Sequence, residues 1–167
     1  FGNVEDFMVG MDRSHPVGEY LLYSSVDTEM LASVLTRATS KGLAEYCEEK
    51  IWKPGGLEFP AYWVADSTGR DMGLSGLCAT LRDYARLAWM FANEGKSTNG
   101  KQVIPPAMVE RLSSPGSELF DAPGVDAYPL VPWNQAFVSS RRKDSEGDFM
   151  ACGSYGQILY AHPRLNT

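Results

Sequence analysis

The stretch Tyr20–Ser25 (YLLYSS) runs directly into Asp27–Leu35 (DTEMLASVL), and the remainder of the chain is organised around this junction. An apolar run ends in Tyr23 and two serines, and a helix is expected immediately behind them. We expect Asp27 to cap this helix, because a carboxylate accepts hydrogen bonds from the free N–H groups of a first turn and suits the helix dipole. Apolar residues at helical spacing then predict a face packed against a core. That face comprises Met30, Leu31, Val34, Leu35 and Ala38.

Tyr23 is the first candidate functional residue. A phenol held just ahead of a buried helix, next to hydroxyl groups, can transfer protons when a nearby cation lowers its pKa. The alternative is a half-buried aromatic residue with a hydrated hydroxyl, which is common at the ends of strands and loops. These residues alone leave both interpretations open.

The composition is that of a globular protein and argues against several classes of partner. At 167 residues the chain is long enough for one domain with a sizeable core. The net charge of −6 gives no general attraction to nucleic acid or to anionic membranes. The basic cluster Arg141–Lys143 is followed at once by acidic residues, so it is expected to form a solvated hairpin tip. No apolar run approaches the ~20 residues of a membrane-spanning helix.

The cysteines and histidines indicate no metal or cofactor site. Cys47, Cys78 and Cys152 lie far apart and form no C-x-x-C pair, so neither a zinc site nor a disulfide framework is predicted. Cys47 is expected to be a packed, unreactive thiol. The two histidines are too few for a His-rich metal centre, which argues against a zinc hydrolase. The chain begins at Phe1 rather than Met, and we expect it to be a piece of a longer protein, so localisation stays open.

Short helices are expected to follow the first one. A second helix is predicted over Leu43–Ile51, closed by Pro54-Gly55-Gly56. The small-residue stretch Gly73–Ala79 should allow close approach of the backbone. Thr80 is expected to open the clearest helix, with Asp83 in the position of a capping-box partner. The expected apolar face of that helix is Leu81, Tyr84, Ala85, Leu87, Ala88, Phe91 and Ala92, with Gly95 as its C′ residue and Arg82, Asp83 and Arg86 on a solvated or ion-paired side.

The last part of the chain has a different period. A third helix, Ala107–Leu112, starts behind prolines, and after an irregular excursion two antiparallel strands are expected at Trp133–Ser140 and Phe149–Tyr160. Glycines at 153 and 156 weaken a strand unless something approaches its backbone, and a substrate carbonyl could do so. Helices first and strands last indicate an α+β fold. We expect residues 1–132 to be a mostly helical region and 133–167 a strand pair, both parts of one larger catalytic domain.

Four blocks of the chain, in this order and spacing, resemble the β-lactamase-related serine hydrolases, which include class C β-lactamases, D-alanyl-D-alanine carboxypeptidases, esterases and 6-aminohexanoate-dimer hydrolase. The resemblance covers nearly the whole chain and is nearest to the esterase and aminohexanoate-hydrolase branch. It is carried by HPVGEY (15–20) leading into YSSVDT (23–28), IWKPGGL (51–57), GLCATLRDYAR (76–86) and the Gly153-x-x-Gly156-Gln157 strand. It implies a β-lactamase/transpeptidase-like fold, present here as an incomplete helical region and part of an antiparallel sheet.

The resemblance also implies roles for individual residues. Tyr23 matches the tyrosine that shuttles a proton between a nucleophilic serine and the leaving group. Ser25 stands where many relatives carry Asn and would contact substrate. Ala151-Cys152-Gly153 replaces the Lys-Thr-Gly triplet of the lactamases, which disfavours strong β-lactamase activity. The backbone N–H of Ser154 would complete an oxyanion hole. Gly153, Tyr155 and Gln157 would line the substrate pocket.

The nucleophile that the resemblance implies, a Ser-x-x-Lys motif, is expected outside this sequence. Ser140-x-x-Lys143 alone fits its letters, but it lies in a charged hairpin behind the tyrosine motif, whereas the family's serine precedes that motif. We therefore expect a serine hydrolase acting on a small amide or ester, without cofactors, and inactive in this piece alone. The alternatives are a degenerate binding or scaffold member of the same fold and a small α+β domain of unrelated function.

Overall fold

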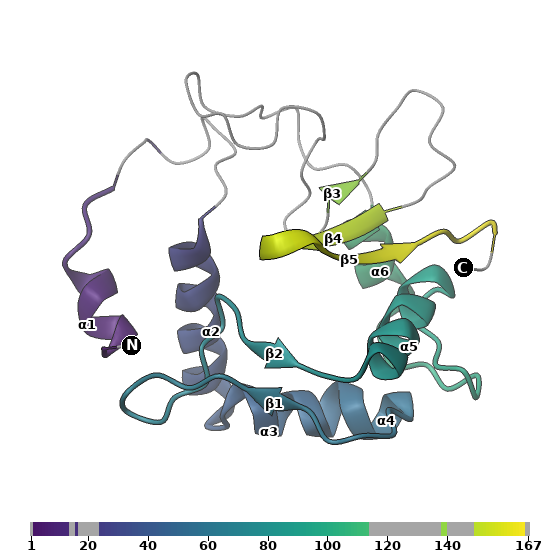
Figure 1. Cartoon of the computed structure of the whole chain (residues 1–167), viewed down its shortest axis with the longest axis horizontal. Coiled ribbons are helices and arrows are strands. Elements are labelled where there is room, and N and C mark those ends of the chain that lie inside the picture. The colour runs from purple at the N-terminus through teal and green to yellow at the C-terminus, as the bar shows by residue number, and fades with distance from the viewer. Residues whose placement is uncertain (1, 14–15, 17–23, 114–137, 140–148, 166–167) are drawn as a thin grey trace.

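The computed structural model describes residues 2–13, 16, 24–113, 138–139 and 149–165 (Figure 1). Tyr23, the excursion at 114–137 and the charged turn at 140–148 lie outside the described residues. The helices are α1 (Val4–Val9), α2 (Ser25–Thr39), α3 (Leu43–Cys47), the π-helical turn η1 (Glu48–Trp52), α4 (Lys53–Gly55), α5 (Leu81–Ala92) and α6 (Pro106–Ser113). The strands are β1 (Tyr62–Trp63), β2 (Leu77–Cys78), β3 (Val138–Ser139), β4 (Phe149–Gly153) and β5 (Gln157–Ala161), with the 3₁₀ turn η2 (Ser154–Gly156) between the last two.

The described part of the chain is α+β, as the sequence predicts. Strands β1 and β2 pair as a short antiparallel ribbon, and β3, β4 and β5 form an antiparallel sheet in that order. In Figure 1 the ribbon runs between α2 and α5, and the β4–β5 hairpin lies on the other side of α5 from α4. None of the described helices is long and apolar enough to cross a membrane.

The cap of α2 is Ser24 and not Asp27, which corrects the sequence prediction. Ser24 has an extended backbone with φ −138°, and its side chain accepts a hydrogen bond from the Asp27 N–H at 3.2 Å. Asp27 lies inside the first turn, where its charge still suits the helix dipole. Both residue types cap helices well, so composition alone could not choose between the two positions.

The packed face of α2 is also different from the predicted one. Met30, Leu31, Val34 and Leu35 are exposed, with 69% of Leu31 accessible, whereas Glu29, Ala32 and Ser33 are buried. The reason is a close approach to Gly73, where an added Cβ would lie 2.2 Å from the Ala32 Cβ. Only small side chains fit at that contact, so the helix docks through its small and polar residues. The close backbone approach predicted for the small-residue stretch is confirmed at Gly73.

The second predicted helix extends further than expected. Helical conformation continues from α3 through η1 to α4 and ends at Gly56, whose φ of 68° suits glycine. Pro54 lies inside this run rather than closing it. A proline lacks the N–H of a regular turn and its ring clashes with the carbonyl four residues earlier, so the wider π-helical turn before it accommodates the residue.

The α5 helix begins at the predicted cap residue, but the predicted C′ position of Gly95 is one residue off. Thr80 is its cap and accepts from the Asp83 N–H at 3.2 Å. At the other end Glu94 takes the left-handed conformation, with φ 54°, and Gly95 donates its N–H to the Met90 carbonyl at 2.7 Å. This six-to-one bond places Gly95 at C″ of a Schellman motif and not at C′.

Two clusters of buried residues hold α5 in place. Met90 is fully buried and packs with Ile104 and Val109, which joins α5 to α6 and to the segment that leads into it. Ala92 packs with Ala161, which joins the end of α5 to β5. The predicted apolar face of α5 is therefore only partly correct, since Leu81 is 86% exposed.

The predicted second strand is in fact a hairpin. It folds back at the three-residue turn Ser154–Gly156, where Tyr155 (φ 65°) and Gly156 (φ 85°) both have positive φ. The two strands then pair in register from Phe149 with Ala161 to Gly153 with Gln157. Tyr-Gly is an uncommon residue pair for a hairpin turn, and strand-forming residues lie on both sides of it. The sequence pattern therefore predicted one continuous strand.

Candidate active site

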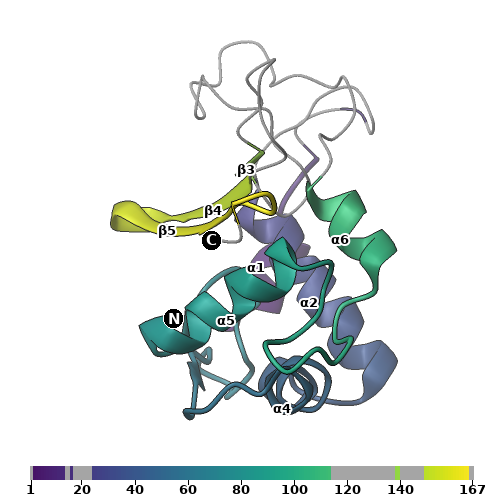
Figure 2. The same cartoon turned by 90° about the vertical axis from the view of Figure 1, so that its right-hand side faces the viewer.

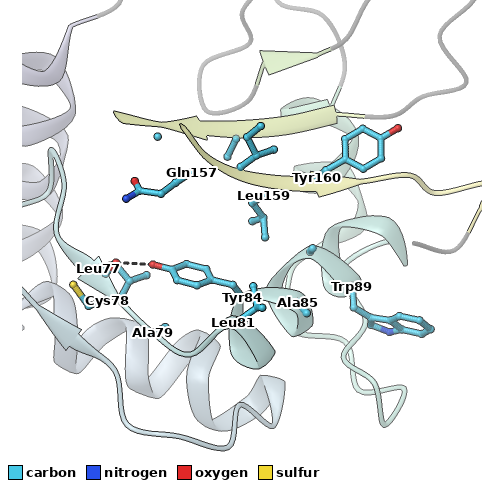
Figure 3. Close-up of a pocket in the computed structure, with 14 residues that line it drawn as sticks. Leu77, Cys78, Ala79, Leu81, Tyr84, Ala85, Trp89, Gln157, Leu159 and Tyr160 are labelled. Atoms are coloured by element: carbon cyan, nitrogen blue, oxygen red, sulfur yellow. Dashed lines mark hydrogen bonds between the residues drawn. The ribbon is translucent and has the colours of Figure 1, made fainter. Parts of the chain in front are cut away.

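A groove of about 1030 Å³ lies between the first half of α5, strand β2 and the β4–β5 hairpin (Figure 3). Near the C-terminal end of α5, Ala92 packs against Ala161 of β5. Toward its N-terminal end the helix leaves the hairpin, and Leu81, Ala85 and Ala88 line the space between them. The groove is therefore largely apolar, as ligand pockets commonly are.

Tyr84 contributes a hydroxyl group to the helical wall of the groove. Its hydroxyl donates to the Leu77 carbonyl at 2.5 Å, the bond drawn in Figure 3. Burial raises the pKa of the Tyr84 phenol, and the nearby Cys78 raises it further. A neutral phenol that already donates its proton is not a base, so Tyr84 is a structural donor between α5 and β2.

Two of the predicted pocket residues, Gly153 and Gln157, line this groove. They are opposite each other at the end of the β4–β5 ladder, next to the hairpin turn. A Cβ on Gly153 would lie 2.7 Å from the Gln157 Oε1 and 3.1 Å from its Cβ, so a side chain at position 153 would displace the side chain of Gln157. Ser154 follows as the first residue of the turn, and its backbone N–H is the predicted oxyanion donor.

The other predicted residues lie elsewhere. Tyr155 is fully exposed at the tip of the turn and is not among the residues lining the groove. Ser25 is the half-buried first residue of α2 and also does not line the groove. Tyr23, the predicted proton shuttle, lies outside the described residues. Tyr84 and Trp89 line the groove but were not predicted as site residues. Helical periodicity indicates which residues of α5 share a face, but it does not indicate that this face borders a groove.

A second pocket of about 460 Å³ lies between α3 and β1, lined by Trp52, Tyr62 and Trp63. Both indole N–H groups are bonded within the fold, Trp52 to the Phe59 carbonyl and Trp63 to the Met72 carbonyl. Cys47 also lines this pocket, and burial raises the pKa of its thiol, which makes it a poor nucleophile. Within the described residues, no group of three His, Cys, Asp or Glu side chains is arranged to hold a metal ion.

The whole of this architecture matches one protein family. The model for the "Beta-lactamase" family aligns with residues 3–165, from the cap of α1 to the end of the described chain. The chain belongs to the β-lactamase family. The α+β fold described above is accordingly the β-lactamase/transpeptidase-like fold, and the sequence resemblance is confirmed.

Individual β-lactamase relatives point to one branch of the family. The chain is 24% identical over 164 residues to the 6-aminohexanoate-dimer hydrolase of Paenarthrobacter ureafaciens, an alignment that covers 97% of this chain and 41% of the relative. A solved Bacillus anthracis protein, described as a candidate 6-aminohexanoate-dimer hydrolase, is 33% identical with a TM-score of 0.83 and is covered over 40% of its length. A candidate β-lactamase from Bacteroides dorei is 18% identical with a TM-score of 0.75, which shows the shared fold.

The chain spans about two fifths of the length of the first two relatives, although 96–97% of it is matched. The matched region of the β-lactamase fold includes helices α1 to α6, the β1–β2 ribbon and the β3–β4–β5 sheet.

Proposed function

We propose that the complete protein hydrolyses a small amide or ester through an acyl-serine intermediate, with the serine supplied by a Ser-x-x-Lys motif outside these 167 residues. The observation that carries the proposal is the family match over residues 3–165 together with the tyrosine motif directly ahead of α2. The tyrosine motif ahead of α2 and the Gly153–Ser154 end of β4 would belong to one catalytic domain.

In this mechanism the serine oxygen attacks the substrate carbonyl carbon. Tyr23 accepts the serine proton and passes it to the leaving amine or alcohol as the bond between the carbonyl carbon and that group breaks. Water then attacks the acyl-serine ester, its proton passes through Tyr23 to the departing serine oxygen, and the acid product is released. The lysine of the Ser-x-x-Lys motif would lower the pKa of Tyr23 so that it can act as a base.

The developing negative charge on the carbonyl oxygen needs fixed donors. The Ser154 N–H, at the start of the tight turn after β4, would provide one donor, and the N–H of the nucleophilic serine the other. Gly153 and Gln157 would line the substrate site beside this donor. Ser25 and Tyr155, which do not line the groove, would contact parts of the substrate that extend beyond it. The donor is a backbone group, so the mechanism requires the turn and not a particular side chain.

The residues of β4 ahead of the turn bear on which substrate the protein would accept. Ala151-Cys152-Gly153 offers no lysine where the lactamases carry Lys-Thr-Gly, so recognition of a β-lactam carboxylate is disfavoured. The names of the relatives point instead to a linear amide such as the 6-aminohexanoate dimer. A degenerate binding protein of the same fold, which has lost the nucleophilic serine, is the second candidate, and the residues at the position of the Ser-x-x-Lys motif in the complete protein distinguish the two.

The complete gene product should be assayed with a p-nitrophenyl ester, the linear 6-aminohexanoate dimer and a chromogenic cephalosporin. We expect turnover of the ester and of the linear amide, with kcat/KM for the cephalosporin lower by at least about 100-fold. The isolated 167-residue chain should be inactive in the same assays. Binding of the amide without turnover would favour the degenerate protein, and ester hydrolysis by the isolated chain above its own Tyr23→Phe variant would contradict the proposal.

A further inference from the structure

The buried face of α2 carries the carboxylate of Glu29, and the other buried residues of this helix, Ala32 and Ser33, are small. Glu29 is 3% exposed and Ser33 is 2% exposed, with Ala32 between them on the same side of the helix. Burying an ionisable side chain is unfavourable unless hydrogen bonds compensate for the lost water. Such a residue on the second turn of a helix therefore needs a specific partner.

The partner of Glu29 is a backbone group far away in the sequence. Its Oε2 accepts a hydrogen bond from the Leu74 N–H at 3.0 Å. The neighbouring Gly73 meets Ala32 so closely that a Cβ there would lie 2.2 Å from the Ala32 Cβ and 3.4 Å from the Thr28 carbonyl oxygen. The N-terminal half of α2 is thus docked on the Gly73–Leu74 backbone by one polar bond and one close contact.

A second set of bonds joins the same face to α1. Arg70 donates to the Ser33 Oγ at 3.1 Å and forms an ion pair with Glu5 at 2.5 Å. The hydrogen bond that Arg70 donates to Glu5 raises the pKa of Arg70, and the charges of Asp66 and Glu29 act in the same direction. We call Glu5, Glu29, Ser33 and Arg70 the α2 clamp. In Figure 2 the helices α1 and α2 that it joins overlap, and Figure 1 shows them as neighbours.

The clamp lies near the functional end of the helix. Glu29 follows the cap residue Ser24 by less than two turns, and an α-helix rises ~1.5 Å per residue, so the two are held about 7 to 8 Å apart along a stiff axis. Ser24 is itself fixed to the helix by the bond from the Asp27 N–H. Whatever holds Glu29 therefore also fixes the point at which Tyr23 joins the helix.

We infer that Glu29 is a positioning residue for acyl transfer: by holding the first turns of α2 against Gly73–Leu74, it fixes the backbone to which Tyr23 is joined through Ser24. This inference rests on the proposed function. A displacement of about 1 Å at a reacting group can cost on the order of 100-fold in rate, so a bond outside the groove can control the chemistry.

The structural part is tested by hydrogen exchange of the purified protein. Glu29→Ala should raise the exchange rate of the Asp27–Met30 amides at least about tenfold, with α5 amides unchanged. Glu29→Gln retains an oxygen that accepts from Leu74, so it should change these rates less than about threefold. Asp83→Ala is the matched control, because Asp83 is also a buried carboxylate that accepts backbone N–H groups, but on α5. It should leave the α2 amides unchanged.

The catalytic part is tested in the complete gene product, well below the melting temperature of each variant. Glu29→Ala should lower kcat about 10- to 100-fold with KM within about threefold of wild type, and Glu29→Gln should restore most of kcat. Asp83→Ala should keep kcat within about twofold. Wild-type kcat in Glu29→Ala, or an equal loss of kcat in folded Asp83→Ala, would overturn the inference.

The two measurements separate the inference from the proposed function. If the wild-type protein turns over none of the substrates, the proposed function is overturned. The hydrogen-exchange rates of the Asp27–Met30 amides in Glu29→Ala still show whether Glu29 holds this end of α2. Unchanged exchange in Glu29→Ala overturns the inference even when the wild type is active.

Discussion

Replacement of Tyr23 by phenylalanine is expected to lower kcat of the complete protein about 1000-fold, within the range of ~10²–10⁴ that a positioned general acid and base contributes. Phenylalanine keeps the ring and removes only the hydroxyl, so binding of substrate should be nearly unchanged and KM should stay within about threefold. Steady-state kinetics with a p-nitrophenyl ester measure both quantities.

The matched control for Tyr23→Phe is Tyr46→Phe. Tyr46 is a half-buried tyrosine on α3, with the Lys50 ammonium 5.8 Å from the centre of its ring, and it does not line the groove. Loss of its hydroxyl should leave kcat within about twofold of wild type. If Tyr23→Phe behaved like this control, Tyr23 would be the ordinary packed tyrosine that the sequence also allowed.

Replacement of Asp83 by alanine is expected to lower the free energy of unfolding by about 3 kcal/mol, because it leaves buried donors without an acceptor. The carboxylate of Asp83 accepts from the Glu58 N–H at 2.8 Å, the Phe59 N–H at 3.1 Å and the Thr80 hydroxyl at 2.9 Å. It also pairs with Arg86 at 3.2 Å. Denaturant unfolding of both proteins measures the difference.

Arg82→Ala is the control for this prediction. Arg82 is 71% exposed and its pair with Glu58 is 3.8 Å long, so its removal should cost less than about 0.5 kcal/mol. An equal loss in the two variants would show that Asp83 does not connect α5 to the Glu58–Phe59 segment as described.

The effect of Asp83 should also depend on pH. Burial would raise the pKa of this carboxyl, but the N–H groups of Glu58 and Phe59, the Thr80 hydroxyl and Arg86 together hold it below its ordinary value. A lowered pKa stabilises the folded state above the unfolded-state pKa of about 4, and this stability is lost as the pH falls through the folded-state pKa. The difference in stability between wild type and Asp83→Ala should therefore shrink below pH ~4.

Much of the fold could be predicted from local sequence. The α5 cap at Thr80 and the start of α6 at Pro106, one residue ahead of the predicted Ala107, follow from side-chain capping and from the fixed φ of proline, which are local effects. The family resemblance was also visible in short motifs. These features depend on residues within one or two turns of each other, so the printed sequence contains what decides them.

The parts that were wrong depend on contacts between distant residues. The buried face of α2 is chosen by Gly73 and Leu74, which lie far along the chain from Ala32 and Glu29. Asp83 is ion-paired with Arg86, which is one of the two predicted alternatives, but it is also fully buried, where the backbone N–H groups of Glu58 and Phe59 bind it. Helical periodicity reports which residues share a face and not what that face meets.

The most direct test of the account is to label the complete gene product with a fluorophosphonate, which forms a stable adduct with activated serines, and to locate the adduct by peptide mass spectrometry. We expect a single adduct on a serine of a Ser-x-x-Lys motif outside the 167 residues, formed much more slowly in Tyr23→Phe. An adduct on a serine within this sequence, such as Ser140, or turnover without any adduct, would contradict the account.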